Sequence, residues 1–197
     1  MNAYKTIELK HRDTKAVIFS HNSEGNTVAK TLRLALILKI DVRHTDLSHQ
    51  DLSNGYFAGA NLNYCNLSGT ILDGGNFSQA RFYRANLYAA SAKGTDLKGA
   101  VLSNTFAQAC DFTGAKLNHA ISQEGDFNHA NFSDADLTDF ATRGANFKKI
   151  ITNAGTILDA TNTRIAYKWK HIAIPCVCDR PCQNCVGCES PKKTGSI

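Results

Sequence analysis

The hydrophobic pattern of the chain repeats every five residues between Thr45 and Ala160. A large apolar residue recurs once per repeat, and a small residue stands two places before it, as in the run Ala60, Asn61, Leu62. The large positions are Leu47, Leu52, Phe57, Leu62, Leu67, Leu72, Phe77, Phe82, Leu87, Leu97, Leu102, Phe112, Leu117, Phe127, Phe132, Leu137, Phe147 and Ile157. Helices repeat at 3.6 residues and strands at 2.0, so this period fits neither element. It is typical of a solenoid, whose stacked coils share one core.

Four repeats close a square coil of about twenty residues, so residues twenty apart should lie above one another at roughly the 4.8 Å spacing of strands. In two such columns a small Ala precedes a large Phe, as expected if the next coil fills the gap. One column is Leu52, Leu72, Ala92, Phe112, Phe132, Thr152, and the other is Leu47, Leu67, Leu87, Ala107, Phe127, Phe147. A third column ends in Ser122 and Thr142, whose hydroxyls we expect to bond to the backbone. The unbroken register predicts about six coils and a rod of about 29 Å.

Asp or Asn often stands between the small and the large residue, as in Ala85, Asn86, Leu87. The repeat therefore resembles that of the pentapeptide-repeat family, whose consensus is A-(D/N)-L-x-x, over well over half of the chain. The resemblance implies an all-β solenoid, the right-handed quadrilateral β-helix of that family. It does not settle the function, because one fold can carry many functions.

Residues 1–44 are predicted to cap the open end of the coil stack, which would otherwise expose its core and an unpaired strand edge. Residues 16–19 predict a short strand, and residues 27–38 predict a helix with Asn26 as its N-cap. Val28, Leu32 and Leu36 form one stripe on this helix. The alternative is a helix that binds a partner.

Residues 161–175 are predicted to form a strand, because Arg164 to Ala173 alternates between apolar and largely cationic side chains. Tyr167 and Trp169 lie on one face of it and Lys168 and Lys170 on the other. Two interpretations remain open. The strand closes the far end of the coil stack, or its aromatic residues form the contact of a homodimer, because aromatic and cationic side chains suit interfaces.

Residues 176–197 form a cysteine-rich tail with five thiols within thirteen residues. Clustered thiolates at spacings of two and three residues suit a structural zinc site. An iron–sulfur cluster and a mobile, metal-free thiol tail are the alternatives. The two remaining cysteines, Cys65 and Cys110, occupy small inward positions and are interpreted as core residues. The four ligands that we expect are Cys178, Cys182, Cys185 and Cys188, with Cys176 and His171 as substitutes.

The chain of 197 residues is long enough for one domain with a sizeable core. It has no run of eighteen apolar residues, and its first residues lack the features of a secretory signal. We therefore expect a cytoplasmic protein without a membrane span. Structural disulfides are not expected in that compartment, despite the seven cysteines.

Charge is unevenly distributed along the chain. Residues 1–44 hold eight Lys/Arg and four Asp/Glu, and residues 161–197 hold six and two, so each end has a net charge of +4. Residues 45–160 hold eight Lys/Arg and eleven Asp/Glu, which gives a net charge of −3. The rod is thus mildly acidic and both ends are basic, which bears on partners and solubility rather than on the fold.

Catalysis is not expected, because the sequence holds no phosphate-binding loop, no G-x-S-x-G and no H-E-x-x-H. One function class is a protein-binding rod, which includes the best-known mode of the resembled family: a mimic of duplex DNA that modulates DNA gyrase. The weak acidity of the rod and the absence of inserted loops depart from that mode. The alternative is a structural or assembly spacer with a metal-binding tail. Direct binding of nucleic acid through the basic ends is a weaker third option.

Overall fold

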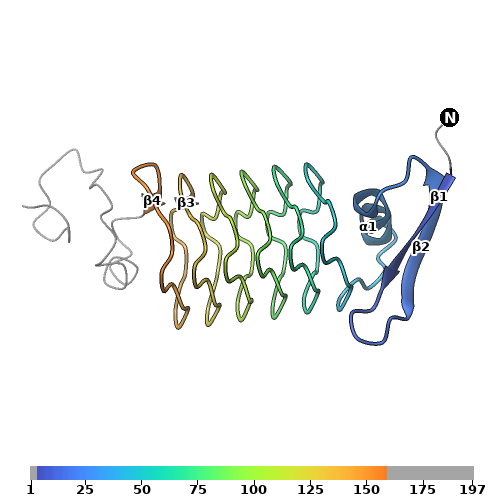
Figure 1. Cartoon of the computed structure of the whole chain (residues 1–197), viewed down its shortest axis with the longest axis horizontal. Helices are drawn as coiled ribbons and strands as arrows, with labels where there is room; N and C mark the ends of the chain where they lie inside the picture. The colour runs from blue at the N-terminus through green and yellow to red at the C-terminus, as the bar shows by residue number, and fades with distance from the viewer. Residues whose placement is uncertain (1–3, 159–197) are drawn as a thin grey trace, which may run out of the picture.

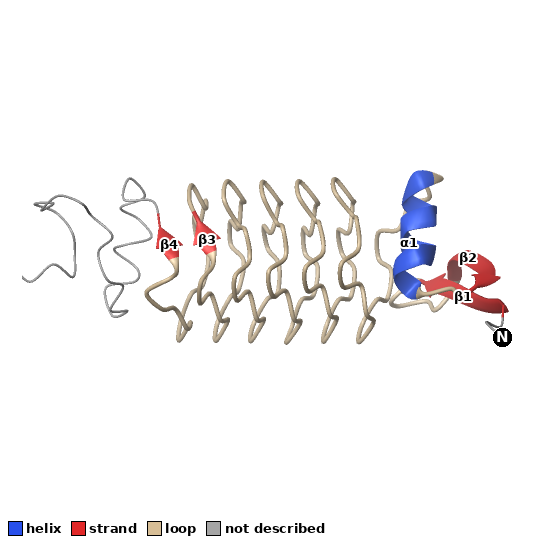
Figure 2. Cartoon of the chain, turned by 90° about the horizontal axis from the view of Figure 1, so that it is seen from above, coloured by secondary structure: helices blue, strands red, loops and turns tan. Residues whose placement is uncertain are grey.

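The computed structural model describes residues 4–158 of the chain. A hairpin and a helix gather at one end of a straight stack of coils (Figure 1), and the same stack is seen from above in Figure 2. The elements are β1 (Tyr4–Lys10), β2 (Val17–Glu24), α1 (Val28–Ile37), β3 (Asp136–Leu137) and β4 (Ile157–Leu158). The expected closing strand at 161–175 and the cysteine-rich tail lie outside the described residues.

Backbone hydrogen bonds join each coil to the next at a distance of twenty residues. Parallel bridges run from the pair Asp46 and Asn66 to the pair Asn131 and Ile151 without a change of offset. Within the first of these bridges, the N–H of Asn66 donates to the carbonyl of Thr45 at 3.0 Å. The coils thus form a four-sided β-helix, and the predicted all-β solenoid with twenty residues per coil is confirmed.

The chain turns its corners through the left-handed region of backbone space. Every fifth residue from His44 to Lys149 has a φ between 53° and 75°. Most of these residues are not glycine, although a side chain in this conformation is uncommon. Their side chains stand at the corners of the rod, so residues twenty apart form vertical rows on its surface.

Large side chains of successive coils fill the core as the column pattern predicts. Phe112 and Phe132 are buried, and their rings stack with 5.1 Å between centroids. Phe127 and Phe147 stack at the same distance in the neighbouring column. Below the coil of Ala92 and Ala107, phenylalanines therefore take up the volume that the small side chains leave.

Several small polar residues in the core have hydroxyl groups that donate to backbone carbonyls. Ser122 donates its hydroxyl to the carbonyl of Ala141 at 3.1 Å, which confirms the structural interpretation of this misfit. Thr70 donates in the same way to the carbonyl of Leu47 at 2.8 Å. A buried hydroxyl without a partner would cost free energy, so these bonds allow serine and threonine to replace apolar residues.

The predicted unbroken register is wrong in the last coil. Asp136 pairs with Ile157, and Leu137 with Leu158, so the offset rises from twenty to twenty-one residues. Ile157, which the pattern placed in the core, is 54% exposed, and Leu158 packs against the core instead. Thr156 takes the small inward position, because its hydroxyl reaches the carbonyl of a buried residue in the preceding coil.

The cap consists of a hairpin and a helix. The predicted strand at 16–19 overlaps the start of β2, which begins at Val17 and pairs antiparallel with β1. The sequence pattern did not predict β1. The predicted helix is α1, and its stripe faces the core: Leu32 is fully buried, and Val28 and Leu36 pack against the core with part of their surface exposed. The cap thus covers the first coil and extends its core.

The N-cap of α1 is Thr27, whose hydroxyl accepts the N–H of Lys30 at 3.2 Å, and not Asn26 as predicted. Asn26 is buried, and its amide donates to the carbonyls of Lys5 and His21 in the two strands. It therefore ties the hairpin to the start of the helix. Capping preferences alone do not predict which of two adjacent cap-forming residues is the N-cap. Here the buried hydrogen bonds of Asn26 to the hairpin leave Thr27 as the N-cap.

Candidate functional site: a groove beside the cap

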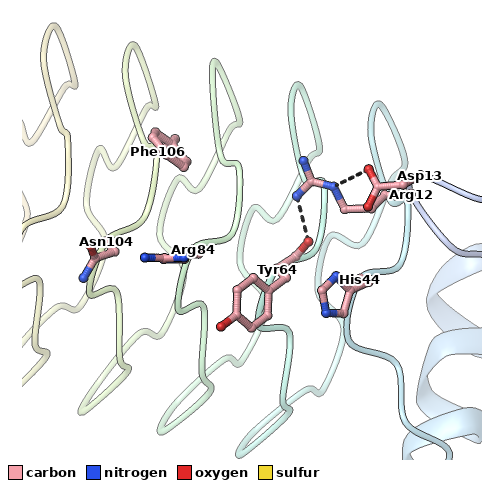
Figure 3. A pocket seen from close by; sticks show the side chains of 7 residues that line it. All are labelled: Arg12, Asp13, His44, Tyr64, Arg84, Asn104 and Phe106. Carbon is pink, nitrogen blue, oxygen red and sulfur yellow. Dashed lines mark hydrogen bonds and ion pairs between the residues drawn. The ribbon is translucent and has the colours of Figure 1, made fainter.

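One open groove of about 490 Å³ runs from the hairpin turn along one corner of the rod (Figure 3). Arg12 and Asp13 come from the turn between β1 and β2. A row of corner residues and one residue on the adjoining side complete the lining. These are His44, Tyr64, Arg84, Asn104 and Phe106. The groove thus joins the cap to four successive coils.

The corner row is fixed by the backbone ladder. Its members stand twenty residues apart and all have positive φ, for example 63° at Tyr64 and 53° at Arg84. The N–H of Tyr64 donates to the carbonyl of Tyr83 at 2.9 Å, and that of His44 to Asn63 at 3.2 Å. Because these N–H groups are already paired, they are not available to a ligand as donors.

Aromatic rings form a continuous stack at the cap end of the groove. The rings of His11 and His44 lie nearly parallel with 5.3 Å between centroids. His44 and Tyr64 follow at 4.7 Å with an interplanar angle of 1°, and Tyr64 meets Tyr83 edge to face at 5.7 Å. This stack gives the groove a flat and rigid aromatic wall.

The two arginines of the groove are held differently. Arg12 donates to the carbonyl of Tyr64 at 2.8 Å and pairs with Asp13 at 3.5 Å, so its charge is largely satisfied. Arg84 lies over the ring of Tyr83 at 5.5 Å. Within residues 4–158 it forms no ion pair, so its guanidinium group remains available to an anionic partner.

Phe106 breaks a local rule of the rod. In its column the other coils carry Asp or Asn, and their side chains bond from coil to coil, as when Asn86 donates to Asn66 at 3.2 Å. Phe106 interrupts this ladder and is 52% exposed. A residue that departs from the local pattern without a gain in packing is a mark of a functional surface.

The sequence did not point to this groove. The predicted dimer residues Tyr167 and Trp169 and the predicted zinc ligands lie outside the described residues, so those interpretations stay predictions. The signal that could have found the groove is the same period of twenty, applied to outward instead of inward positions. It aligns His44, Tyr64 and Arg84 in one row.

Two cysteines can be excluded from chemistry at the site. Cys65 and Cys110 are fully buried, as predicted. Burial raises the pKa of the Cys65 thiol to about 12 and raises the pKa of Cys110 as well. Both thiols therefore stay protonated and unreactive at neutral pH.

A group of three metal-ligating side chains occurs once within the described residues, at the cap end of the groove. There His11, Asp13 and His44 offer ligand atoms within 4.8 Å of one another. On another corner His119 contacts Asp139 at 3.1 Å, with no third ligand grouped with the pair in the described part of the chain.

No helix among the described residues has the length and apolar character needed to cross a bilayer.

The Pentapeptide repeats family matches the sequence in eight copies over residues 43–79, 80–118 and 110–148, which together cover more than half of the chain. The chain belongs to the pentapeptide-repeat family. Its coil stack is the right-handed quadrilateral β-helix of that family, as the resemblance implied. No curated protein sequence matches the chain significantly.

Several solved pentapeptide-repeat structures are similar to this chain. One from the thylakoid lumen of Arabidopsis thaliana has 28% identity over 48% of this chain and 66% of its own, with a TM-score of 0.48. QnrB1, a plasmid-mediated fluoroquinolone resistance protein, has 16% identity over 66% and 83%, with a TM-score of 0.47. A protein from Nostoc PCC 7120 has 23% identity over 62% and 96%, with a TM-score of 0.40.

Proposed function

We propose that this pentapeptide-repeat protein is a non-enzymatic, protein-binding rod that holds an acidic, extended segment of a partner protein in the groove beside its cap. The observation that carries the proposal is that the groove is lined both by the exposed Phe106 and by Arg84, whose guanidinium group forms no ion pair within residues 4–158. Aromatic and arginine side chains on a rigid support are the usual anchors of protein interfaces. No reaction is proposed, because the lining residues include no serine or cysteine nucleophile and only one carboxylate.

The size of the groove supports an extended peptide. The corner row covers three steps between coils, or about 14 Å, which matches four or five residues of extended chain. A partner carboxylate would pair with Arg84, and an apolar partner side chain would cover Phe106. Strand addition is not proposed, because the corner N–H groups already donate to the next coil.

DNA mimicry finds little electrostatic support. Duplex DNA carries one negative charge per about 1.7 Å, so a segment as long as the rod would carry about 17. Residues 45–160 have a net charge of only −3. DNA gyrase remains a candidate partner through the family resemblance, but we propose that contact would come through the groove and not through a DNA-like surface. A spacer role would depend on the tail, outside the described residues.

The test is a comparison of two matched substitutions in the full chain. Phe106→Asn installs a side chain of the type that the other coils carry in its column, so the coil should be preserved. Ile121→Asn changes a second exposed apolar residue at the equivalent place on another side of the rod and serves as control. A partner that binds through the groove should be captured by the wild type and the control but not by Phe106→Asn or Arg84→Glu.

A photo-crosslinker at Tyr64 would then identify the bound segment. An acidic segment supports the proposal, and a basic segment, or equal capture by all variants, contradicts it. Gyrase supercoiling assays run with the same proteins test that partner. If the wild type inhibits supercoiling and Phe106→Asn does not, gyrase is identified as the partner. If the wild type does not inhibit supercoiling, gyrase is excluded as the partner.

A further inference from the structure

We propose that His11, Asp13 and His44 form a binding site for one divalent transition-metal ion of the zinc type, which fastens the cap to the first coil. Their ligand atoms lie within 4.8 Å of one another, and both imidazoles are half-buried whereas Asp13 is exposed. The proposal concerns a different chemistry from that of the groove and does not depend on the groove having a partner.

The three side chains come from both sides of one junction. His11 follows β1 and pairs antiparallel with Thr45 of the first coil. The N–H of Arg12 donates to the carbonyl of His44 at 2.7 Å, which places Asp13 beside the first corner. Backbone bonds therefore hold the ligands near one another before any ion binds, and this lowers the ordering cost of binding.

The distances require a small contraction. Zinc bonds to nitrogen and oxygen of about 2.0–2.2 Å in a tetrahedral site place ligand atoms about 3.3 Å apart. The ligand atoms must therefore approach by at most about 1.5 Å. The exposed side chain of Asp13 can make this movement. The two imidazole rings lie within 10° of parallel, so one ring must turn about its Cβ–Cγ bond to direct its nitrogen at the same ion.

Existing bonds at the junction compete with the ion. Nδ1 of His11 accepts the N–H groups of Asp13 and Thr14 at 3.2 and 3.3 Å, so its lone pair is directed at these backbone groups. An ion on this nitrogen would replace two long contacts. The carboxylate of Asp13 would leave Arg12, which keeps its bond to the carbonyl of Tyr64. Both exchanges preserve the backbone contacts between cap and coil.

The ligand set selects the kind of metal. Two imidazoles and one carboxylate suit zinc, nickel and copper ions, whereas magnesium and calcium prefer oxygen ligands throughout. Three protein ligands leave a fourth position open to water at the end of the groove. The ion would connect the hairpin turn directly to the coil, so it should stabilise the docked cap by binding the folded state.

The test uses zinc alone and the full chain with its tail thiols alkylated, because the tail is itself a predicted zinc site. Cys65 and Cys110 should resist alkylation, since burial raises their pKa values. Calorimetric titration should then find one zinc ion per chain. Asp13→Asn and His44→Asn should each weaken binding about tenfold or more. Asn suits position 44 because it tolerates the left-handed backbone there.

His119→Gln is the matched control, because it removes a histidine that contacts a carboxylate elsewhere on the rod. It should bind zinc as the wild type does. Zinc should also raise the melting temperature of the wild type and of this control, but not of Asp13→Asn. Asp13 is exposed, so this variant should fold even if a histidine variant does not. Failure of the alkylated protein to bind zinc, or equal binding by Asp13→Asn, would overturn the proposal.

Discussion

Replacing Gly125 by alanine should destabilise the protein, although alanine is the commonest residue at this position of the repeat. The backbone of Gly125 is not in the left-handed region, and Gly→Ala changes at such sites usually stabilise by about 0.4–1 kcal/mol. Here, however, the added Cβ would lie 2.6 Å from Cε2 of Phe127 and 3.2 Å from the carbonyl oxygens of Leu102 and Ser122. The substitution therefore forces a neighbour to move.

The ring of Phe127 has little room to do so. Its centroid lies 5.1 Å from that of Phe147 and 5.9 Å from that of Phe132. Phe112 and Phe140 follow at 6.1 and 6.2 Å. Overpacking of a tight core costs about 1–3 kcal/mol, so Gly125→Ala should lower the free energy of unfolding by about that amount.

A double-mutant cycle separates this clash from other effects. Leucine at position 127 has no ring atom to meet the new methyl group, so Gly125→Ala in a Phe127→Leu background should stabilise by about 0.4–1 kcal/mol. The coupling free energy between the two sites should then be about 1.5–4 kcal/mol. Urea unfolding of the full chain, followed by far-ultraviolet circular dichroism, measures all four proteins. A coupling below about 0.5 kcal/mol would refute the packing argument.

Four further predictions follow from the core, the buried thiol and the chain beyond residue 158. Phe132→Ala should cost about 3–5 kcal/mol by urea unfolding, because it leaves a cavity among stacked rings, and a variant that melts like the wild type would contradict the register. Burial raises the folded-state pKa of Cys65 to about 12, so its contribution to stability is complete below the unfolded pKa of about 8.5 and is lost as the pH rises toward 12. Cys65→Ala removes this buried thiol and its bond to the carbonyl of Val42 at 3.2 Å, so it should be less stable than the wild type at pH 7 but should lose less stability above pH 9. An alkaline profile equal to that of the wild type would argue against a protected thiol. Trp169→Ala should give monomers with an intact β-helix if residue 169 forms a dimer contact, whereas a wild-type monomer in light scattering would rule the dimer out. Cys185→Ser should abolish zinc binding by the tail under reducing conditions with little change in the melting temperature of the rod, and rapid alkylation of all tail thiols in metal-free protein would disprove that site.

The core could be predicted almost residue by residue because one strict period governs it. One large side chain per repeat must point inward for the coil to close, so the period alone places Phe112 and Phe132 in one column. The end of the period was not predictable in this way. Ile157 and Leu158 are both large and apolar, and Gly155 and Thr156 are both small, so two registers satisfy the pattern. The pairing of β3 with β4 and the hydrogen bond of Thr156 decide between them.

The groove depends on contacts that periodicity does not describe. β1 has only two buried apolar side chains, Ile7 and Leu9, which is too weak an alternation to predict the strand that carries the turn. Without the hairpin, Arg12 cannot be placed beside Tyr64. The contact between His11 and His44 is also not predicted by the sequence pattern, because the two residues meet only when the cap folds back on the first coil.

The one-residue shift between β3 and β4 sets a limit on how these rods can associate. In a solenoid with identical coils, the last coil would expose an edge on which the first coil of another copy could pair. Copies could then join head to tail without closure, as in a filament. After the shift, the edge at Ile157 and Leu158 is out of phase with the ladder below it. Within the described residues, a copy that docked on this edge would have to pair in the shifted register, and the hairpin covers the opposite end. The one-residue shift thus works against head-to-tail pairing of identical coils.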